Sequence, residues 1–411
     1  MLFACGAAAI PGNWRHHLVV VAMHHCQASC RIALLLGMME TVSTFRAFTP
    51  SAFTIQRQVG QLGFATEVEW QYYGGQRNPL DPQQPARTVE ASGISVRLFQ
   101  ATLLEGERCL LKEFMPSACE IGENELQMYQ QLSEGSQVPV QLGTLLGYMR
   151  SDASFDTDSF RDAWSRSLPR TPPPMPGNLW LVFRWQGLST VGNFPRVPQE
   201  RDFFDFGGKG LRQARSRYLK VLTGRSLQVL AFLHGRGIVH RSVGPSSLLL
   251  STTDQSAYEQ LSVRAIDLGF AASASTLPQD EIDRAIQRGA SPLNVLPLLA
   301  LNDLHGLGYV LIELFLATAA AQDAPDKADS ARSTEQQALK RLIEDIFGGD
   351  VRGEFRDYCA EEPAWAGAVA MLDEDDGAGW ELLQQLVDCR RGELAGSVSA
   401  QSLLDSSKWF Q

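Results

Sequence analysis

Residues 230–250 read LAFLHGRGIVHRSVGPSSLLL, and residues 263–271 read VRAIDLGFA. The first stretch ends a pattern of apolar residues at helical spacing: Leu219, Leu222, Leu230 and Leu233. Gly235 and Gly237 predict the end of this helix, because glycine readily takes the left-handed conformation of a C-terminal cap. A short apolar strand should follow, then a polar loop over 240–247, two more short strands and a second polar loop after residue 266.

The two polar loops resemble the catalytic and magnesium loops of the protein kinase superfamily, which read H-R-D-L-x-x-x-N and D-F-G. His240 and Arg241 match the first motif, but Ser242 stands in the place of its catalytic Asp and Ser247 in the place of its metal-binding Asn. Asp267 matches the magnesium-binding Asp. The resemblance implies an α+β, bilobal protein-kinase-like fold, with a small β-rich N-lobe and a mainly helical C-lobe. It also implies ATP and Mg²⁺ as ligands, the metal at Asp267.

A glycine-rich phosphate loop is the next element that the resemblance implies. The stretch 91–101 overlays the family's G-x-G-x-x-G-x-V pattern, although Gly93 is the one glycine of the three that is kept. An earlier stretch, 59–64, carries Gly60 and Gly63, but 52 positions separate Gly60 from the candidate ATP lysine, Lys112. That separation favours 91–101, which leaves room for one strand and its return.

Lys112 lies in the apolar stretch 108–114, which resembles the V-A-I-K strand whose lysine binds the ATP phosphates and pairs with a helical Glu. We expect Glu125 to be that partner, with Glu123 as the alternative. A lysine on a strand is more often solvated, but the apolar neighbours of Lys112 favour a buried position at the mouth of a cleft. Phe183 falls at the gatekeeper position of the stretch 179–187. The resemblance thus assigns nucleotide binding to Gly93, Lys112, Glu125, Phe183 and Asp267.

Composition limits the classes of partner. A net charge of -10 argues against a nucleic-acid partner, which selects for a basic surface. The 7 cysteines follow neither a disulfide framework nor a zinc-finger spacing. We therefore expect a protein partner, which the sequence does not identify.

The first 39 residues contain no Asp or Glu, and this composition is typical of an organellar transit peptide. The apolar runs there are too short to span a bilayer, so we expect no transmembrane span. The stretch 179–187, LWLVFRWQG, is similar to plant thylakoid protein kinases. Together these features favour a chloroplast location, with peripheral thylakoid association left open; the alternative is the cytoplasm.

The predicted domain organisation follows from these assignments. Residues 1–48 form the transit peptide, 49–84 an unassigned extension, and 85–411 the kinase-like domain, with its N-lobe at 85–187 and its C-lobe at 188–411. We expect a polar, proline-ended linker over 151–177 and an exposed insert at 320–338. A central apolar helix should begin near Asn302, with Asp303 capping it and holding the catalytic-loop backbone.

Three functions remain open. Serine is no general base near neutral pH and is a poor magnesium ligand, so the first is a catalytically impaired pseudokinase that binds ATP as a regulatory or scaffold module. The second is an active Ser/Thr protein kinase with an unorthodox catalytic loop. The third is a nucleotide-free scaffold, in which Lys112, Glu125 and Asp267 form a structural polar network.

Overall fold

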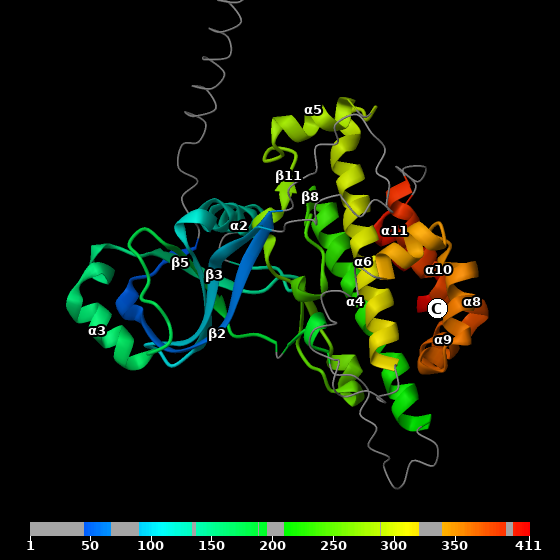
Figure 1. Ribbon diagram of the computed structural model, residues 1–411, viewed down its shortest axis with the longest axis horizontal. Coiled ribbons are helices and arrows are strands. Elements are labelled where there is room, and N and C mark those ends of the chain that lie inside the picture. The colour runs from blue at the N-terminus through cyan, green and yellow to red at the C-terminus, as the bar shows by residue number, and fades with distance from the viewer. Residues whose placement is uncertain are drawn as a thin grey trace, which may run out of the picture. The chain divides into compact units, whose positions relative to one another are not determined.

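The computed structural model describes residues 45–66, 90–133, 137–187, 189–194, 209–287, 289–319, 339–391 and 398–411. Most of the predicted transit peptide and the predicted insert at 320–338 lie outside these ranges. The described chain forms a β-rich part followed by a mainly helical part (Figure 1). The mixed α+β class expected from the sequence is therefore confirmed.

A six-stranded sheet with the order β1-β5-β6-β4-β3-β2 forms the β-rich part. Its strands are β1 (Arg46–Ala47), β2 (Phe53–Thr66), β3 (Glu90–Leu103), β4 (Arg108–Phe114), β5 (Leu145–Arg150) and β6 (Leu179–Arg184). All neighbouring pairs are antiparallel except β1 and β5. Antiparallel neighbours suit the short connection between β3 and β4, which a tight turn at Gly106 closes.

The sheet is buried on both faces, and the alternation of side chains along β6 shows this directly. Leu179, Leu181 and Phe183 join the large core that also contains helix α2 (Cys119–Leu132). Trp180 and Val182 point to the opposite face, where a second, smaller core lies under helix α3 (Asp158–Ser167). A strand buried on both sides reads as a continuous apolar run, as 179–183 does.

The prediction of a polar linker over 151–177 is wrong. This segment contains α3, whose Trp164 packs edge-on against Phe99 of β3 with 5.8 Å between the ring centroids. The indole Nε1–H of Trp164 donates to the carbonyl of Thr171, and the guanidinium of Arg97 donates to the carbonyl of Pro172. The buried apolar residues of this segment, Phe155, Trp164 and Leu168, are too few among polar neighbours to make a recognisable helical pattern.

The domain boundaries at residues 49 and 85 are also corrected by the structure. β2 pairs with β3 along its length, from Phe53 opposite Leu103 to Thr66 opposite Glu90. Phe45 and Phe48, which flank β1, are buried in the cores. The sheet therefore takes strands from residue 46 onward, and the compact unit of the described chain begins at residue 45.

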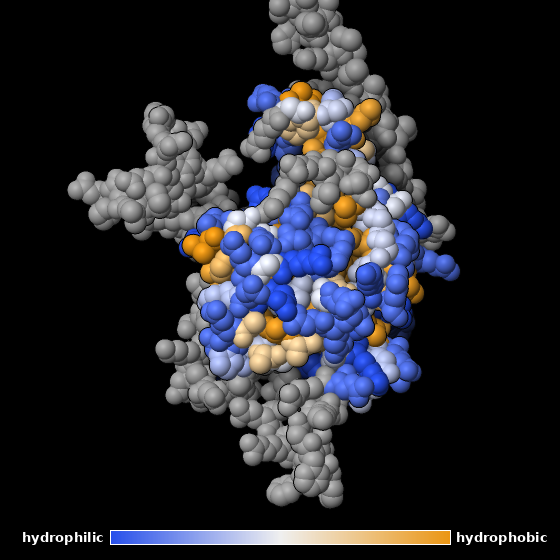
Figure 2. Space-filling model, turned by 90° about the vertical axis from the view of Figure 1, so that its right-hand side faces the viewer, coloured by the Kyte–Doolittle hydropathy of each residue, from blue (hydrophilic) through white to orange (hydrophobic). Residues whose placement is uncertain are grey.

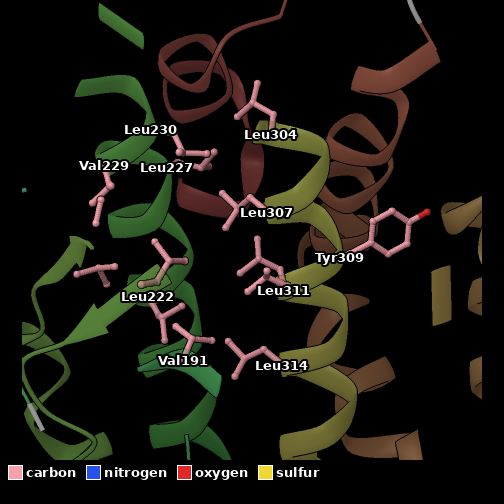
Figure 3. Close-up of a cluster of buried hydrophobic side chains, with 14 of the residues drawn as sticks. Val191, Leu222, Leu227, Val229, Leu230, Leu304, Leu307, Tyr309, Leu311 and Leu314 are labelled. Atoms are coloured by element: carbon pink, nitrogen blue, oxygen red, sulfur yellow. The ribbon is translucent and has the colours of Figure 1, made fainter. Parts of the chain in front are cut away.

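Two long helices, α4 (Lys209–Gly235) and α6 (Val295–Ala319), are the centre of the helical part. Leu307 and Leu311 of α6 point toward α4, where Leu227 and Leu230 lie (Figure 3). The end of α4 at Gly235 agrees with the prediction. By length and composition the stretch 292–316 could cross a membrane, but 61% of its most apolar window is buried inside the protein, as in a core helix.

Shorter elements surround these two helices. Strands β7 (Ser189–Thr190), β9 (Leu248–Leu250) and β10 (Val263–Ala265) form one small sheet, and β8 (Ile238–Val239) pairs with β11 (Ala272–Ser273). The helices are α5 (Gln279–Gln287), α8 (Arg356–Glu361), α9 (Ala366–Leu372), α10 (Glu374–Asp388) and α11 (Ala400–Ser406). The face that carries the C-terminal helices is mainly hydrophilic (Figure 2), as expected for a surface in contact with water.

Candidate functional site

Lys112, Glu125 and Asp267 meet between the sheet and the helical part. The Nζ of Lys112, at the middle of β4, lies 2.7 Å from Oε2 of Glu125 and 2.6 Å from Oδ1 of Asp267. Glu125 comes from α2, and Asp267 follows β10 in a left-handed conformation with φ of 62°. The lysine side chain is 7% exposed, so it is not the solvated edge residue of the alternative interpretation.

The charges of these three groups depend on one another. Burial would lower the pKa of Lys112, but the Coulomb attraction of Asp267 and Glu125 outweighs it and raises that pKa above its usual value. Burial raises the pKa of Glu125, and Lys112 opposes that shift. The ammonium stays charged and is shared by two carboxylates.

Glu123, the alternative partner for Lys112, faces solvent instead. Its carboxylate pairs with Arg150 at 2.7 Å, and both side chains are about half exposed. Positions 123 and 125 are two residues apart and therefore lie on different faces of α2, so one acid is in a surface pair and the other in the buried one.

The loop from His240 to Ser247 is held by Asp303 of α6. One carboxylate oxygen accepts from the backbone amide of His240 and the other from that of Arg241, both at 2.7 Å. Asp303 thus binds the loop backbone as expected, but it does not cap the helix, because α6 begins at Val295. The helix includes Pro297 in its first turn, where the missing N–H of a proline has no intrahelical partner to lose.

The two serines of this loop differ in exposure and in hydrogen bonding. Ser242 is exposed at the loop surface. The hydroxyl of Ser247 donates to the carbonyl of Gly244 at 2.8 Å and accepts from the backbone amide of Gly244 at 3.0 Å. These two bonds close a local turn. The sequence 240–247 contains no Asp or Glu, and the loop therefore offers neither a general base of suitable pKa nor a carboxylate ligand.

A cavity of about 390 Å³ opens beside Lys112 and Asp267. Its apolar lining comes from Val59, Leu98, Leu110, Phe183, Leu249 and Ile266. The stretch from Phe183 to Gly187, with Ser189 and Thr190, also lines the cavity, and Phe183 packs on Tyr129 of α2 with 5.6 Å between ring centroids. The volume lies within the range of pockets for small molecules and cofactors.

The predicted glycine loop at 91–101 is wrong. This stretch belongs to β3 and pairs with β2: Ala91 is opposite Ala65, and Ile94 is opposite Gly63. Gly93 therefore lies within a paired strand. Val59, from the stretch excluded by its distance to Lys112, lines the cavity. The separation along the chain between Gly60 and Lys112 was a misleading criterion, because residues 67–89 lie between β2 and β3 in the sequence although these two strands are neighbours in the sheet.

Leu98, Leu110 and Leu249 were missed by sequence reasoning. Leu110 lies two positions before Lys112 on β4, and Leu98 of β3 lies directly opposite Lys112. Both leucines therefore share a face of the sheet with the lysine. Strand alternation from Lys112 could have found Leu110, whereas Leu98 required the register between β3 and β4.

A magnesium site is only partly present. No group of three or more His, Cys, Asp or Glu side chains that could hold a metal ion occurs among the residues that the structure describes. Asp267 faces the cavity, but its Oδ1 already accepts from Lys112. The residues fit an apolar, base-sized ligand better than a metal-bound triphosphate.

Comparison with known proteins agrees with a distant kinase-like relationship. The chain is 22% identical over 262 residues to the chloroplastic serine/threonine-protein kinase STN8 of Arabidopsis thaliana. The match covers 56% of this chain and 48% of that kinase, so the chain spans about half the length of the curated relative it matches. No family model matches the chain.

Proposed function

We propose that this chain is a bilobal, protein-kinase-like protein with impaired phosphoryl transfer, which binds an adenine nucleotide and acts as a regulatory or scaffold module. The observation that carries the proposal is the combination of two features. Lys112, Glu125 and Asp267 meet beside a cavity that residues 183–187 help to line. The loop held by Asp303 nevertheless presents Ser242 and an internally bonded Ser247.

The chemistry follows from what these residues can do. ATP and Mg²⁺, when bound, would supply the transferable phosphoryl group and its charge neutralisation. Leu98, Leu110 and Leu249 would enclose the base, and Lys112 would lie nearest the phosphates. At position 242, a hydroxyl of high pKa neither orients nor deprotonates an acceptor, and loss of a general base alone removes about 10²–10⁴ in rate.

A phosphoryl-transfer assay tests the impairment. The purified full chain is incubated with γ-labelled ATP, Mg²⁺ and a generic protein substrate, and the same assay is run on Lys112→Met. We expect the two proteins to give the same background of labelled product. Transfer by the wild type that disappears in Lys112→Met would show an active kinase with an unorthodox loop.

A nucleotide-free scaffold is the second candidate, because Lys112 already pairs with both Glu125 and Asp267. Thermal unfolding with and without ATP separates it from the first. We expect ATP to raise the melting temperature. Unchanged melting at millimolar ATP, adenosine and ADP would favour the scaffold.

We also propose a plastid location, with residues 1–44 as the core of a transit peptide. The absence of Asp and Glu from residues 1–39 supports the proposal, and the similarity to a chloroplastic kinase adds to it. Fusion of residues 1–48 to a fluorescent protein should direct it to plastids. A cytoplasmic distribution of that fusion would refute the assignment.

A further inference from the structure

The positive charges around the cavity are already paired. Among the described residues that line it, Lys112 and Arg184 are the cationic side chains. Lys112 binds both Glu125 and Asp267, and Arg184 binds Glu107 at 2.6 Å. Lys112, Glu125 and Asp267 together carry a net charge of about -1 when all three are ionised. A bound triphosphate would therefore lie beside a cluster of net negative charge, and among the described lining residues no unpaired cation would bind it.

The oxygen ligands for a bridging magnesium ion are also incomplete. Mg²⁺ requires near-octahedral oxygen coordination, usually with one or two carboxylates beside the phosphates. Ser247 is 3% exposed, and its hydroxyl is bound to Gly244. Asp267 would have to release the ammonium of Lys112 before its Oδ1 could coordinate a metal ion.

The remaining cavity lining is suited to an uncharged aromatic ring. Leu98 and Leu110 come from neighbouring positions on β3 and β4, and Leu249 comes from β9 in the helical part. Phe183 closes the cavity next to Tyr129. Burial of an apolar ring between such side chains stabilises a complex in proportion to the area removed from water, whatever the charge elsewhere on the ligand.

We propose that this pocket recognises the nucleoside portion of its ligand, and that the phosphates and Mg²⁺ add little to the affinity. The inference rests on the proposed function, since it concerns the same pocket. It makes the site a metal-independent nucleoside or nucleotide sensor, and it predicts that the site lacks the preference for ATP with Mg²⁺ that a site built for phosphoryl transfer would show.

Calorimetric titration of the full chain tests the proposal with three probes: adenosine, ATP in EDTA, and ATP with Mg²⁺. We expect the three dissociation constants to agree within about threefold. If ATP with Mg²⁺ binds about tenfold or more tightly than both adenosine and ATP in EDTA, the inference is overturned, but the proposed nucleotide pocket stands. Absence of binding by all three would overturn the nucleotide pocket as well.

The variant Asp267→Asn gives a second, sharper test. Its amide oxygen can still accept from Lys112, but one negative charge is removed from the cluster. We expect ATP in EDTA to bind about fivefold more tightly, because a like charge near the phosphates is lost, while adenosine binds unchanged. Weaker binding of ATP with Mg²⁺ in this variant would instead show that Asp267 holds the metal, and would overturn the inference.

Asp405→Asn is the matched control. Asp405 is exposed on α11, accepts a hydrogen bond from Gln401, and does not line the pocket. It should bind all three probes as the wild type does. The melting temperature of each variant without ligand checks that it folds. If Asp267→Asn does not fold, the titrations of the wild type with the three probes still test the proposal.

Discussion

At the scale of single residues, the loop 240–247 has a firmly held backbone and contains no carboxylate. The amides of His240 and Arg241 bind Asp303, and the Nε2 of His240 lies 3.0 Å from the carbonyl of Ile266. Arg241 has a φ of 65°, in the left-handed region that costs a non-glycine residue energy. Such strained backbone persists because Asp303 holds it, even though Ser242 beside it carries no carboxylate.

Replacement of Ser242 alone should therefore not restore phosphoryl transfer. In Ser242→Asp the loop gains a carboxylate, but Ser247 remains bound to Gly244 and Oδ1 of Asp267 remains bound to Lys112. Effects of residues that act as one unit are not additive, so one restored group recovers little. Autophosphorylation measured with γ-labelled ATP is expected to equal that of the wild type. A clear increase in the single variant would contradict this account.

At the scale of elements, α3 and its flanking residues cover the second buried face of the sheet. Phe155, Trp164 and Leu168 cover Phe99 and Trp180 of the sheet. Under it, Arg97 and Glu113 form a buried pair, and Asn178 donates to the same carboxylate at 2.7 Å. The segment 151–178 is thus attached to the sheet by apolar contacts and by a buried network in which Arg97 and Asn178 both donate to Glu113, and buried charged groups need such partners.

The variant Trp164→Ala should destabilise the protein by about 3–5 kcal/mol, as for other buried aromatic residues replaced by alanine. It removes the contact with Phe99 and the hydrogen bond to Thr171. The free energy of unfolding can be measured in urea. Arg166→Ala, at an exposed position of the same helix, is the control and should change stability little. Equal stability of the two variants would mean that α3 does not pack firmly on the sheet.

At the scale of the whole molecule, Lys112 joins the β-rich part to the helical part. Its partners belong to α2 and to the loop after β10, 155 positions away along the chain. Removal of one member of a buried ion pair leaves an uncompensated charge and costs more than removal of both. We therefore expect Lys112, Glu125 and Asp267 to stabilise the protein in addition to their role in the proposed ligand site.

A double-mutant cycle measures this coupling. Lys112→Met should cost about 3–5 kcal/mol in the free energy of unfolding, because Glu125 is left buried without a cation. The double variant Lys112→Met/Glu125→Gln should be less destabilised than the sum of the single variants by about 0.5–3 kcal/mol. Denaturant unfolding monitored by circular dichroism provides the values.

Lys220→Met is the control for that cycle. Lys220 also lies near two carboxylates, those of Glu374 and Asp375, each at 3.3 Å, but on the surface. Its removal should cost no more than about 1 kcal/mol, since solvent screens exposed pairs. Strict additivity of the Lys112 and Glu125 variants would show that the buried pair carries no net interaction energy.

The amino-acid sequence by itself determined the local features: the helix that ends at Gly235, the short strands around the two polar loops, and the identity of Lys112, Glu125 and Asp267 as candidates. These depend on spacing and residue type within a few positions of one another. Only the tertiary structure decided that β2 joins the sheet, that α3 covers it, and that Leu98 and Leu249 line the cavity with Val59. Those facts depend on pairings between distant segments, and an insertion such as 67–89 changes the distance along the chain without changing the neighbours in space.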